Sequence, residues 1–168
     1  MNFIYIGKIV NTHGIKGEVR LLSDFAEKNL VFKKGFKIYI GEDLEEHIIN
    51  TYRPHKGFDM ITLEGIFDIN MVLKYKGQKV YINKEDLNLK KDEYLLEDLI
   101  GMKIICNNEY LGVVKDIIDN KAGKLLQITF AKNYYIPYNN YYIKRVNLET
   151  KEIDTENAKD LILWKLIF

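Results

Sequence analysis

The stretch that decides the fold lies near the start of the chain: FIYIGKIV at residues 3–10, NTHGIKG at residues 11–17 and EVRLL at residues 18–22. The first segment carries aromatic and β-branched residues on both faces, which favours a strand buried on both sides. The last segment alternates polar and apolar residues, as a half-buried strand does. Two glycines, Gly14 and Gly17, suit a tight turn between them. The stretch therefore predicts a β-hairpin.

The rest of the first half reads as more short strands, at residues 36–40, 48–53, 58–63 and 79–82. Lys56-Gly57 is placed to turn the chain between two of them. Ser23 predicts a capped helical turn, and Asp68 predicts a helix that runs to Tyr75 and ends at Gly77. Short strands with little helix are typical of a small closed barrel rather than an open sheet.

A polar segment, NKEDLNLKKD at residues 83–92, separates this region from the rest of the chain. We interpret it as a linker between a domain at residues 1–82 and a second domain at residues 93–168. The alternative is an ordinary loop inside one domain, since 168 residues fit one average domain or two small ones.

The second half repeats the pattern of short strands, predicted at residues 99–105, 110–118, 125–130, 134–138, 143–147 and 152–154. Asn107-Asn108 predicts a hairpin turn. A terminal helix is expected from Thr155 through Leu163. The fold class predicted for the whole chain is all-β: two small β-barrels joined by a short linker, with short helices.

Composition excludes several classes of protein. The chain has 25 basic and 24 acidic residues, and its net charge of +1 is too small for binding that rests on excess positive charge alone. One cysteine cannot build a disulfide framework or a thiolate zinc site, and the three histidines lack metal-ligand spacing. The start has no secretory pattern and no run is apolar enough to span a membrane. We expect a cytoplasmic protein without a membrane partner.

Catalytic signatures are also missing from the sequence. It contains neither the phosphate loop GxxxxGK[ST] nor the dinucleotide turn GxGxxG. His13 has no serine or cysteine nucleophile near it in the chain, and Cys106 is interpreted as structural. We therefore predict no catalytic residue, no metal and no cofactor.

Four segments in a fixed order resemble one protein family. The segment GKIVNTHGIKGEVR at residues 7–20 is similar to the start of RimM, a family of bacterial ribosome maturation factors. EYLLEDLIG at residues 93–101 resembles the opening of that family's PRC-barrel domain. LGVVKDI at residues 111–117 and IPY at residues 136–138 resemble later strands of the same domain.

This resemblance implies a fold and a function. The fold would be an N-terminal barrel like those of translation factors, followed by a PRC barrel. The function would be that of a non-enzymatic assembly factor. It would bind ribosomal protein nineteen of the small subunit, in the subunit head, and support maturation of the ribosomal RNA. We expect a monomer whose partners are that protein and the precursor small subunit.

Three residues of the first motif are candidates for ribosome contact: His13, Lys16 and Arg20. In an extended strand Arg20 lies on the same face as Lys16 and Glu18, so the two cations could touch phosphates and Glu18 could hold Arg20 in place. The alternative is that the motif only builds a corner of the barrel, with His13 capping a turn. Both roles are compatible.

Tyr94, Leu95 and Leu96 are the candidate contacts with the partner protein, since the resemblance implies adjacent aromatic residues there. Tyr94 keeps one aromatic anchor, while Leu95 can bury apolar area but cannot stack or hydrogen-bond. Lys124 is a second departure, because relatives usually carry an acidic residue near it.

Two other functions stay open at this point. A direct RNA-binding β-barrel module would use Lys16, Arg20 and the tyrosines at 134, 135, 138, 141 and 142. The sequence has 22 lysines but only three arginines and many asparagines and isoleucines, a bias that makes each lysine or tyrosine weak evidence. We therefore interpret these tyrosines, and the apolar tail at residues 163–168, as packing. An RNA-processing enzyme using His13 is the third hypothesis.

Overall fold

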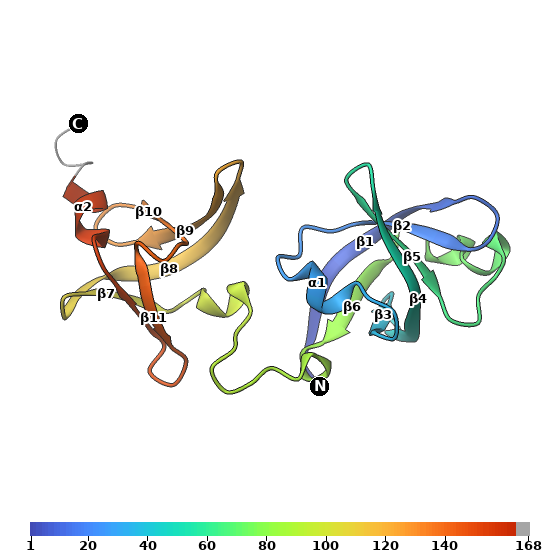
Figure 1. Cartoon of the computed structure of the whole chain (residues 1–168), viewed down its shortest axis with the longest axis horizontal. Helices are drawn as coiled ribbons and strands as arrows, with labels where there is room; N and C mark the ends of the chain where they lie inside the picture. The colour runs from blue at the N-terminus through green and yellow to red at the C-terminus, as the bar shows by residue number, and fades with distance from the viewer. Residues whose placement is uncertain (164–168) are drawn as a thin grey trace. The chain divides into compact units, whose positions relative to one another are not determined.

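The structure is a computed structural model that describes residues 1–163. It divides into two compact units, residues 1–90 and the chain from Lys91 onward. Figure 1 shows that both units consist mainly of strands, and that the helices in each unit are short. The predicted all-β class is therefore confirmed. The apolar tail at residues 164–168 lies outside the described residues.

The first unit is a barrel. Its strands are β1 (Phe3–His13), β2 (Glu18–Leu22), β3 (Lys37–Ile40), β4 (Glu45–His55), β5 (Phe58–Leu63) and β6 (Lys79–Asn83). Their hydrogen-bonded order, β1-β2-β5-β4-β3-β6, closes because β6 also pairs with β1. One helical turn, α1 (Lys28–Val31), follows β2.

The barrel interior is filled by aliphatic side chains from every strand. Fully or almost fully buried residues include Ile6, Ile9, Val19, Leu21, Ile38, Ile49, Ile61, Leu63, Val80 and Ile82. Each such side chain stabilises the fold by roughly 2 kcal/mol relative to an exposed one. Because alternate residues of a strand point to opposite faces, this core sends Glu18 and Arg20 to the outside of the barrel.

The helix predicted from Asp68 to Tyr75 is wrong in type. The chain forms two short 3₁₀ helices instead, Ile69–Met71 and Leu73–Tyr75. Asp68 caps the first one as expected, accepting a hydrogen bond from the Asn70 amide at 2.7 Å. Ile15 of the first hairpin accepts a hydrogen bond from the Ile69 amide, which ties this segment to the β1–β2 turn. Tertiary contacts thus replace the regular helix that local residues favour.

The described residues of the second unit form a six-stranded sheet. Its strands are β7 (Lys103–Cys106), β8 (Glu109–Asn120), β9 (Gly123–Thr129), β10 (Tyr134–Pro137), β11 (Ile143–Asn147) and β12 (Glu152–Thr155). The order is β10-β9-β8-β7-β12-β11, with β12 parallel to β7, and no ladder joins β10 to β11 among the described residues. Among the described residues, this sheet is therefore open and does not close into a barrel.

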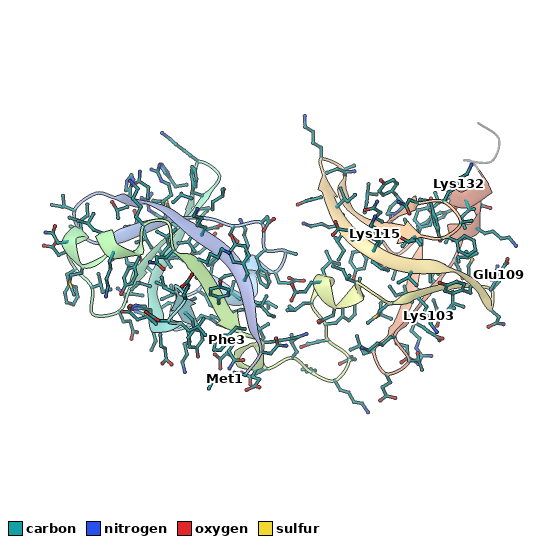
Figure 2. The ribbon with its side chains drawn as sticks, turned by 180° about the vertical axis from the view of Figure 1, so that it is seen from behind. Met1, Phe3, Lys103, Glu109, Lys115 and Lys132 are labelled. Atoms are coloured by element: carbon teal, nitrogen blue, oxygen red, sulfur yellow. The ribbon has the colours of Figure 1, made fainter. Side chains whose placement is uncertain are left out.

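The second unit has its own hydrophobic core beneath this sheet. It contains Leu99, Met102, Ile104, Leu111, Val114, Leu126, Ile128, Tyr134, Ile136 and Ile153. The terminal helix α2 (Ala158–Leu163) lies against β10 and begins later than predicted, because Thr155 still belongs to β12. Lys103, Lys115 and Lys132 are exposed around this core (Figure 2).

Two boundaries differ from the sequence interpretation. The strand predicted at residues 99–105 begins only at Lys103, because Leu96–Leu99 form a 3₁₀ helix and Gly101 has a positive φ of 88°. The segment predicted as a linker, residues 83–92, is partly structured: Asn83 ends β6 and Lys84–Leu87 form another 3₁₀ helix. Asn83 caps that helix with its side chain.

Candidate binding surfaces

His13 and Arg20 meet on the outside of the barrel. His13 is the last residue of β1 and Arg20 lies in β2, and Nη2 of Arg20 lies 3.3 Å from Nδ1 of His13. A guanidinium nitrogen can only donate, so Nδ1 of His13 accepts this hydrogen bond. The neutral imidazole therefore carries its proton on Nε2. The structure thus brings together two of the three residues predicted in this motif.

Glu18 does not hold Arg20, contrary to our expectation. Its carboxylate accepts two hydrogen bonds from Arg53 of β4, at 3.0 and 2.6 Å. This bidentate pair holds the pKa of Glu18 below its usual value. Arg20 instead lies over the ring of Phe58, 5.0 Å from its centroid. The partner of Glu18 comes from 35 residues further along the chain, a distance that strand spacing alone cannot bridge.

Lys16 takes no part in the His13–Arg20 hydrogen bond and is exposed, as the third residue of the turn at residues 14–17. Gly17 has a φ of 89°, and a Cβ atom there would lie 3.0 Å from Cγ2 of Ile66. Gly17 is therefore closely packed at a corner of the barrel, whereas a Cβ atom at Gly14 would have no neighbour within 4 Å. The corner also presents Ile15 to solvent, with 77% of its surface exposed.

Besides Glu18 and the buried Met60, three further residues share the outer face with His13 and Arg20. Cross-strand pairing sets Arg20 opposite Met60, Met60 opposite Arg53, and Phe58 opposite His55. Paired residues and alternate residues of a strand share one face of a sheet. We call the set His13, Arg20, Arg53, His55 and Phe58 the arginine–histidine face.

The arginine–histidine face was only half visible in the sequence. The imidazole rings of His13 and His55 lie 5.8 Å apart although the residues are distant in the chain. Desolvation, with the nearby charges of Arg53 and Lys56, holds the pKa of His55 below its ordinary value. A signal did exist, since two of the three arginines of this lysine-rich chain lie here.

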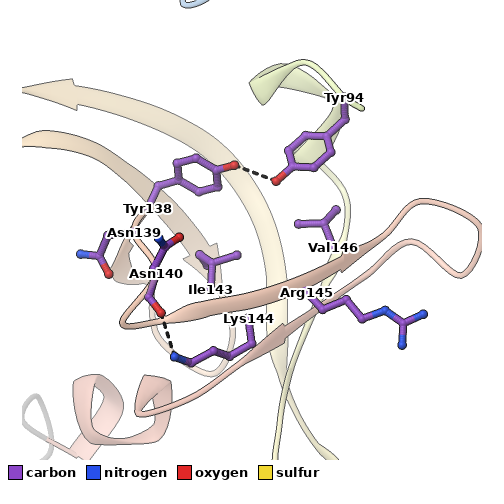
Figure 3. A pocket seen from close by; sticks show the side chains of 8 residues that line it. All are labelled: Tyr94, Tyr138, Asn139, Asn140, Ile143, Lys144, Arg145 and Val146. Carbon is purple, nitrogen blue, oxygen red and sulfur yellow. Dashed lines mark hydrogen bonds between the residues drawn. The ribbon is translucent and has the colours of Figure 1, made fainter. Parts of the chain in front are cut away.

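Tyr94 lies beside a pocket in the second unit. Its hydroxyl and that of Tyr138 are 2.7 Å apart (Figure 3). The pocket has a volume of about 230 Å³ and is lined by Tyr94, Tyr138, Asn139, Asn140, Ile143, Lys144, Arg145 and Val146. We call it the tyrosine pocket. The hydrogen bond joins residues 44 positions apart, so the sequence did not reveal the pairing.

The two leucines after Tyr94 are placed differently. Leu95 is fully buried, so its side chain is not available to a partner as predicted. Its backbone amide donates to Asp98 at 2.8 Å, which fixes the start of the 3₁₀ helix. Leu96 is partly buried and packs against the core of the second unit. Of the three predicted contacts, Tyr94 alone lines the tyrosine pocket.

The cations of the tyrosine pocket have different surroundings. Lys144 donates to the carbonyl of Asn140 at 2.8 Å and lies 3.3 Å from Glu156. Arg145 is exposed, and Figure 3 shows its guanidinium extending away from the two tyrosines. The pocket thus combines an aromatic edge with a cationic one.

Two of the remaining tyrosines, Tyr134 and Tyr142, pack into the second unit as predicted, whereas Tyr135 and Tyr141 are 38% and 60% exposed. Tyr134 is buried and its hydroxyl donates to the carbonyl of Leu111 at 2.7 Å. The ring of Tyr142 packs edge-on against Tyr141 and against the core. Lys124, which departs from the family pattern, forms an ion pair with Asp119 at 2.7 Å.

The described residues contain no cluster of histidine, cysteine or carboxylate side chains arranged to hold a metal ion. Among residues 1–163, no helix is long and apolar enough to cross a membrane. His13 lies next to Arg20 and His55.

Comparison with known proteins covers both units. The model of the RimM N-terminal domain matches residues 4–87, and the PRC-barrel domain model matches residues 91–162. A protein named ribosome maturation factor RimM from an Exiguobacterium species is 35% identical, over 91% of this chain and 92% of that protein. A protein of the same name from Bacillus cytotoxicus is 37% identical, over 94% of this chain and 96% of that protein. A crystal structure of a RimM protein from Pseudomonas aeruginosa is 22% identical, with a TM-score of 0.45 over 95% of this chain and 99% of that one. The chain therefore belongs to the RimM family of ribosome maturation factors.

Proposed function

We propose that this protein is a non-enzymatic assembly factor that acts in the cytoplasm as a monomer. It binds the head of the immature small ribosomal subunit through ribosomal protein nineteen of that subunit, and it supports maturation of the ribosomal RNA. Family membership supports the ribosomal role. The identity of the partner protein rests on the family resemblance.

The tyrosine pocket is the observation that carries the proposed protein contact. Tyr94 and Tyr138 hold each other through their hydroxyls, so both rings are fixed before a partner arrives. Rigid aromatic side chains make good anchors because they bury a large area at a small cost in side-chain entropy. Arg145 also lines the pocket, and its exposed guanidinium extends away from the two rings (Figure 3). Because Leu95 is buried, we place the contact on Tyr94 and the pocket rather than on all three predicted residues.

The barrel corner is the proposed second contact. The turn at residues 14–17 presents Lys16 and Ile15, and Phe67 in the adjoining loop is also 77% exposed. A cation and two apolar side chains suit a mixed surface of protein and RNA. His13 and Arg20 lie on β1 and β2, the two strands that this turn joins. Two modest contacts, one on each unit, then combine through effective concentration.

The protein contact is tested with the purified full-length protein and purified ribosomal protein nineteen. Tyr94→Ala should weaken binding, measured by calorimetry, by about 1 kcal/mol or more, since it removes an anchor and its hydrogen bond to Tyr138. Tyr141→Ala is the matched control, because Tyr141 is 60% exposed and lies outside the tyrosine pocket. Equal affinities for wild type and Tyr94→Ala would remove Tyr94 from the interface.

The assembly role is tested by recovering particles with a tagged full-length protein. Precursor small subunits should be enriched over mature ones. Recovery of mature subunits alone, or of none, contradicts the proposed function. Tight binding to naked RNA with a steep salt dependence, and no binding to ribosomal protein, would favour the direct RNA-binding module instead.

A further inference from the structure

The arginine–histidine face and its neighbouring turn carry more positive than negative charge. Arg20 and Arg53 lie on it, and Lys56 follows His55 in the turn between β4 and β5. Glu18 is the carboxylate that faces them, and its two oxygens are already occupied by Arg53. The charge of Arg20 is thus met by a ring and an imidazole, not by an anion.

Hydrogen-bond donors on this face lack protein acceptors. Because Nδ1 of His13 accepts from Arg20, the Nε2–H of His13 remains as a donor. The Nε atom of Arg20 is buried and has no hydrogen-bond partner in the structure. A buried donor without an acceptor is costly, and such a group calls for an explanation. An incoming acceptor that lets Arg20 shift slightly would satisfy it.

The pKa of His55, the second imidazole of this face, depends on the charges near it. The ring of His55 lies 5.8 Å from that of His13, and desolvation, with the cations around it, holds the pKa of His55 below its ordinary value. An anion placed between these groups would reverse that balance, because it stabilises every positive charge near it. The groups that face the two imidazoles are Arg20 and Glu18 from β2, and Arg53 and Lys56 from β4 and its turn.

We propose that the arginine–histidine face, completed by Lys56, binds phosphate groups of an RNA backbone. The proposal deepens the proposed function and rests on it for the source of the RNA, which is the ribosomal RNA of the precursor subunit. The groups lie on the half-exposed outer surface of adjacent strands. There a chain of phosphates can meet several separated cations, whereas one free phosphate meets only some of them.

The test uses the full-length protein and a fluorescent single-stranded RNA of about 16 nucleotides, with binding followed by anisotropy. Lys56→Gln and His55→Gln should each weaken binding about fivefold, and Lys56→Gln should lower the salt dependence by about one phosphate contact. Lys115→Gln is the matched control, since it removes an exposed cation from the second unit (Figure 2). If Lys56→Gln and His55→Gln both lose no more affinity than Lys115→Gln does, the proposal is overturned.

The pH dependence gives a second readout. Wild-type affinity for the RNA should rise as the pH falls from about 8 to about 5.5, through the range where an imidazole takes up its proton. His55→Gln should flatten this profile while Lys56→Gln should not. A wild-type profile that is already flat contradicts a role for the imidazole.

A binding measurement with inorganic phosphate distinguishes a free anion from an RNA backbone as the ligand. Binding that is equally tight for inorganic phosphate and for the RNA would assign a free anion and overturn the RNA assignment. Sedimentation with precursor subunits separates this inference from the proposed function. If the wild type does not sediment with them, the proposed function fails. If it does, and the two variants bind the subunits and the RNA like wild type, the phosphate site alone fails.

Discussion

Charges at single positions decide how the outer face of the barrel behaves. Glu18 and Arg53 form a bidentate pair in which the Glu18 side chain is only 16% exposed. Such a pair fixes both side chains and gives β2 and β4 a contact although they are not neighbours in the barrel order. The pair also leaves Arg20 free to stack on Phe58 rather than bond to a carboxylate.

The Glu18 pair predicts how stability depends on pH. Because the folded state lowers the pKa of Glu18, its contribution is fully present above the unfolded value of 4.5 and is lost as the pH falls through the lower, folded value. Glu18→Gln should therefore destabilise the protein at pH 7 and reduce the further loss of stability in acid. Urea unfolding at pH 7 and at pH values below 4.5 measures both effects. Glu42→Gln, at an exposed position, is the control, and an acid loss in Glu18→Gln as large as in wild type contradicts the prediction.

The sequence indicated residues that act near one another in the chain and missed those that act across it. His13 and Arg20 could be proposed together because one hairpin carries both. The pairings of Arg53 with Glu18 and of Tyr138 with Tyr94 could not be proposed, because the partners lie 35 and 44 positions apart. The inward direction of Leu95 was also hidden, since a leucine next to a tyrosine suits a surface or a core equally well.

Turns were the elements that local residues determined best. Lys56 and Gly57 adopt positive φ angles of 50° and 80°, and Asn107 and Asn108 adopt 50° and 62°, as two-residue hairpin turns require. The parallel pairing of β12 with β7 could not be predicted from local residues, because it joins residues nearly 50 positions apart and depends on how they pack. The segment at residues 68–75 became 3₁₀ for a similar reason, since its contact with Ile15 outweighed its helical spacing.

Two hairpins offer a matched test of packing in the barrel corner. Gly17 and Gly57 both have positive φ, at 89° and 80°, but only Gly17 has neighbours within 4 Å of an added Cβ. Gly57→Ala should cost about 1 kcal/mol from backbone strain alone. Gly17→Ala should cost more, because the methyl group also meets Ile66 at 3.0 Å.

Chemical denaturation of the two glycine variants measures the difference. Equal losses of stability would show that the β1–β2 turn can move away from residues 66–68, and the corner would then not be rigid. A larger loss for Gly17→Ala means that the corner presents Lys16 and Ile15 from a fixed frame, as a preformed contact needs.

At the scale of the whole molecule, two separate cores carry two separate surfaces. The units at residues 1–90 and from Lys91 onward each bury their own aliphatic residues, so each has the means to fold alone. Neither surface is a deep site with converging reactive groups. We propose that the tyrosine pocket and the barrel corner are instead two modest contacts, whose combined strength depends on the chain that joins them.

Cutting that chain therefore predicts a large loss of binding without loss of either contact. Residues 1–90 and residues 91–168, produced separately, should each keep their sheet content by circular dichroism. Each should bind precursor small subunits at least about 100-fold more weakly than the full-length protein, because the second contact is no longer intramolecular. A flexible Gly/Ser insertion after Lys90 should give an intermediate affinity that falls as the insertion lengthens. If one unit alone binds like the full chain, the protein acts through a single surface, and the unit that binds identifies which one.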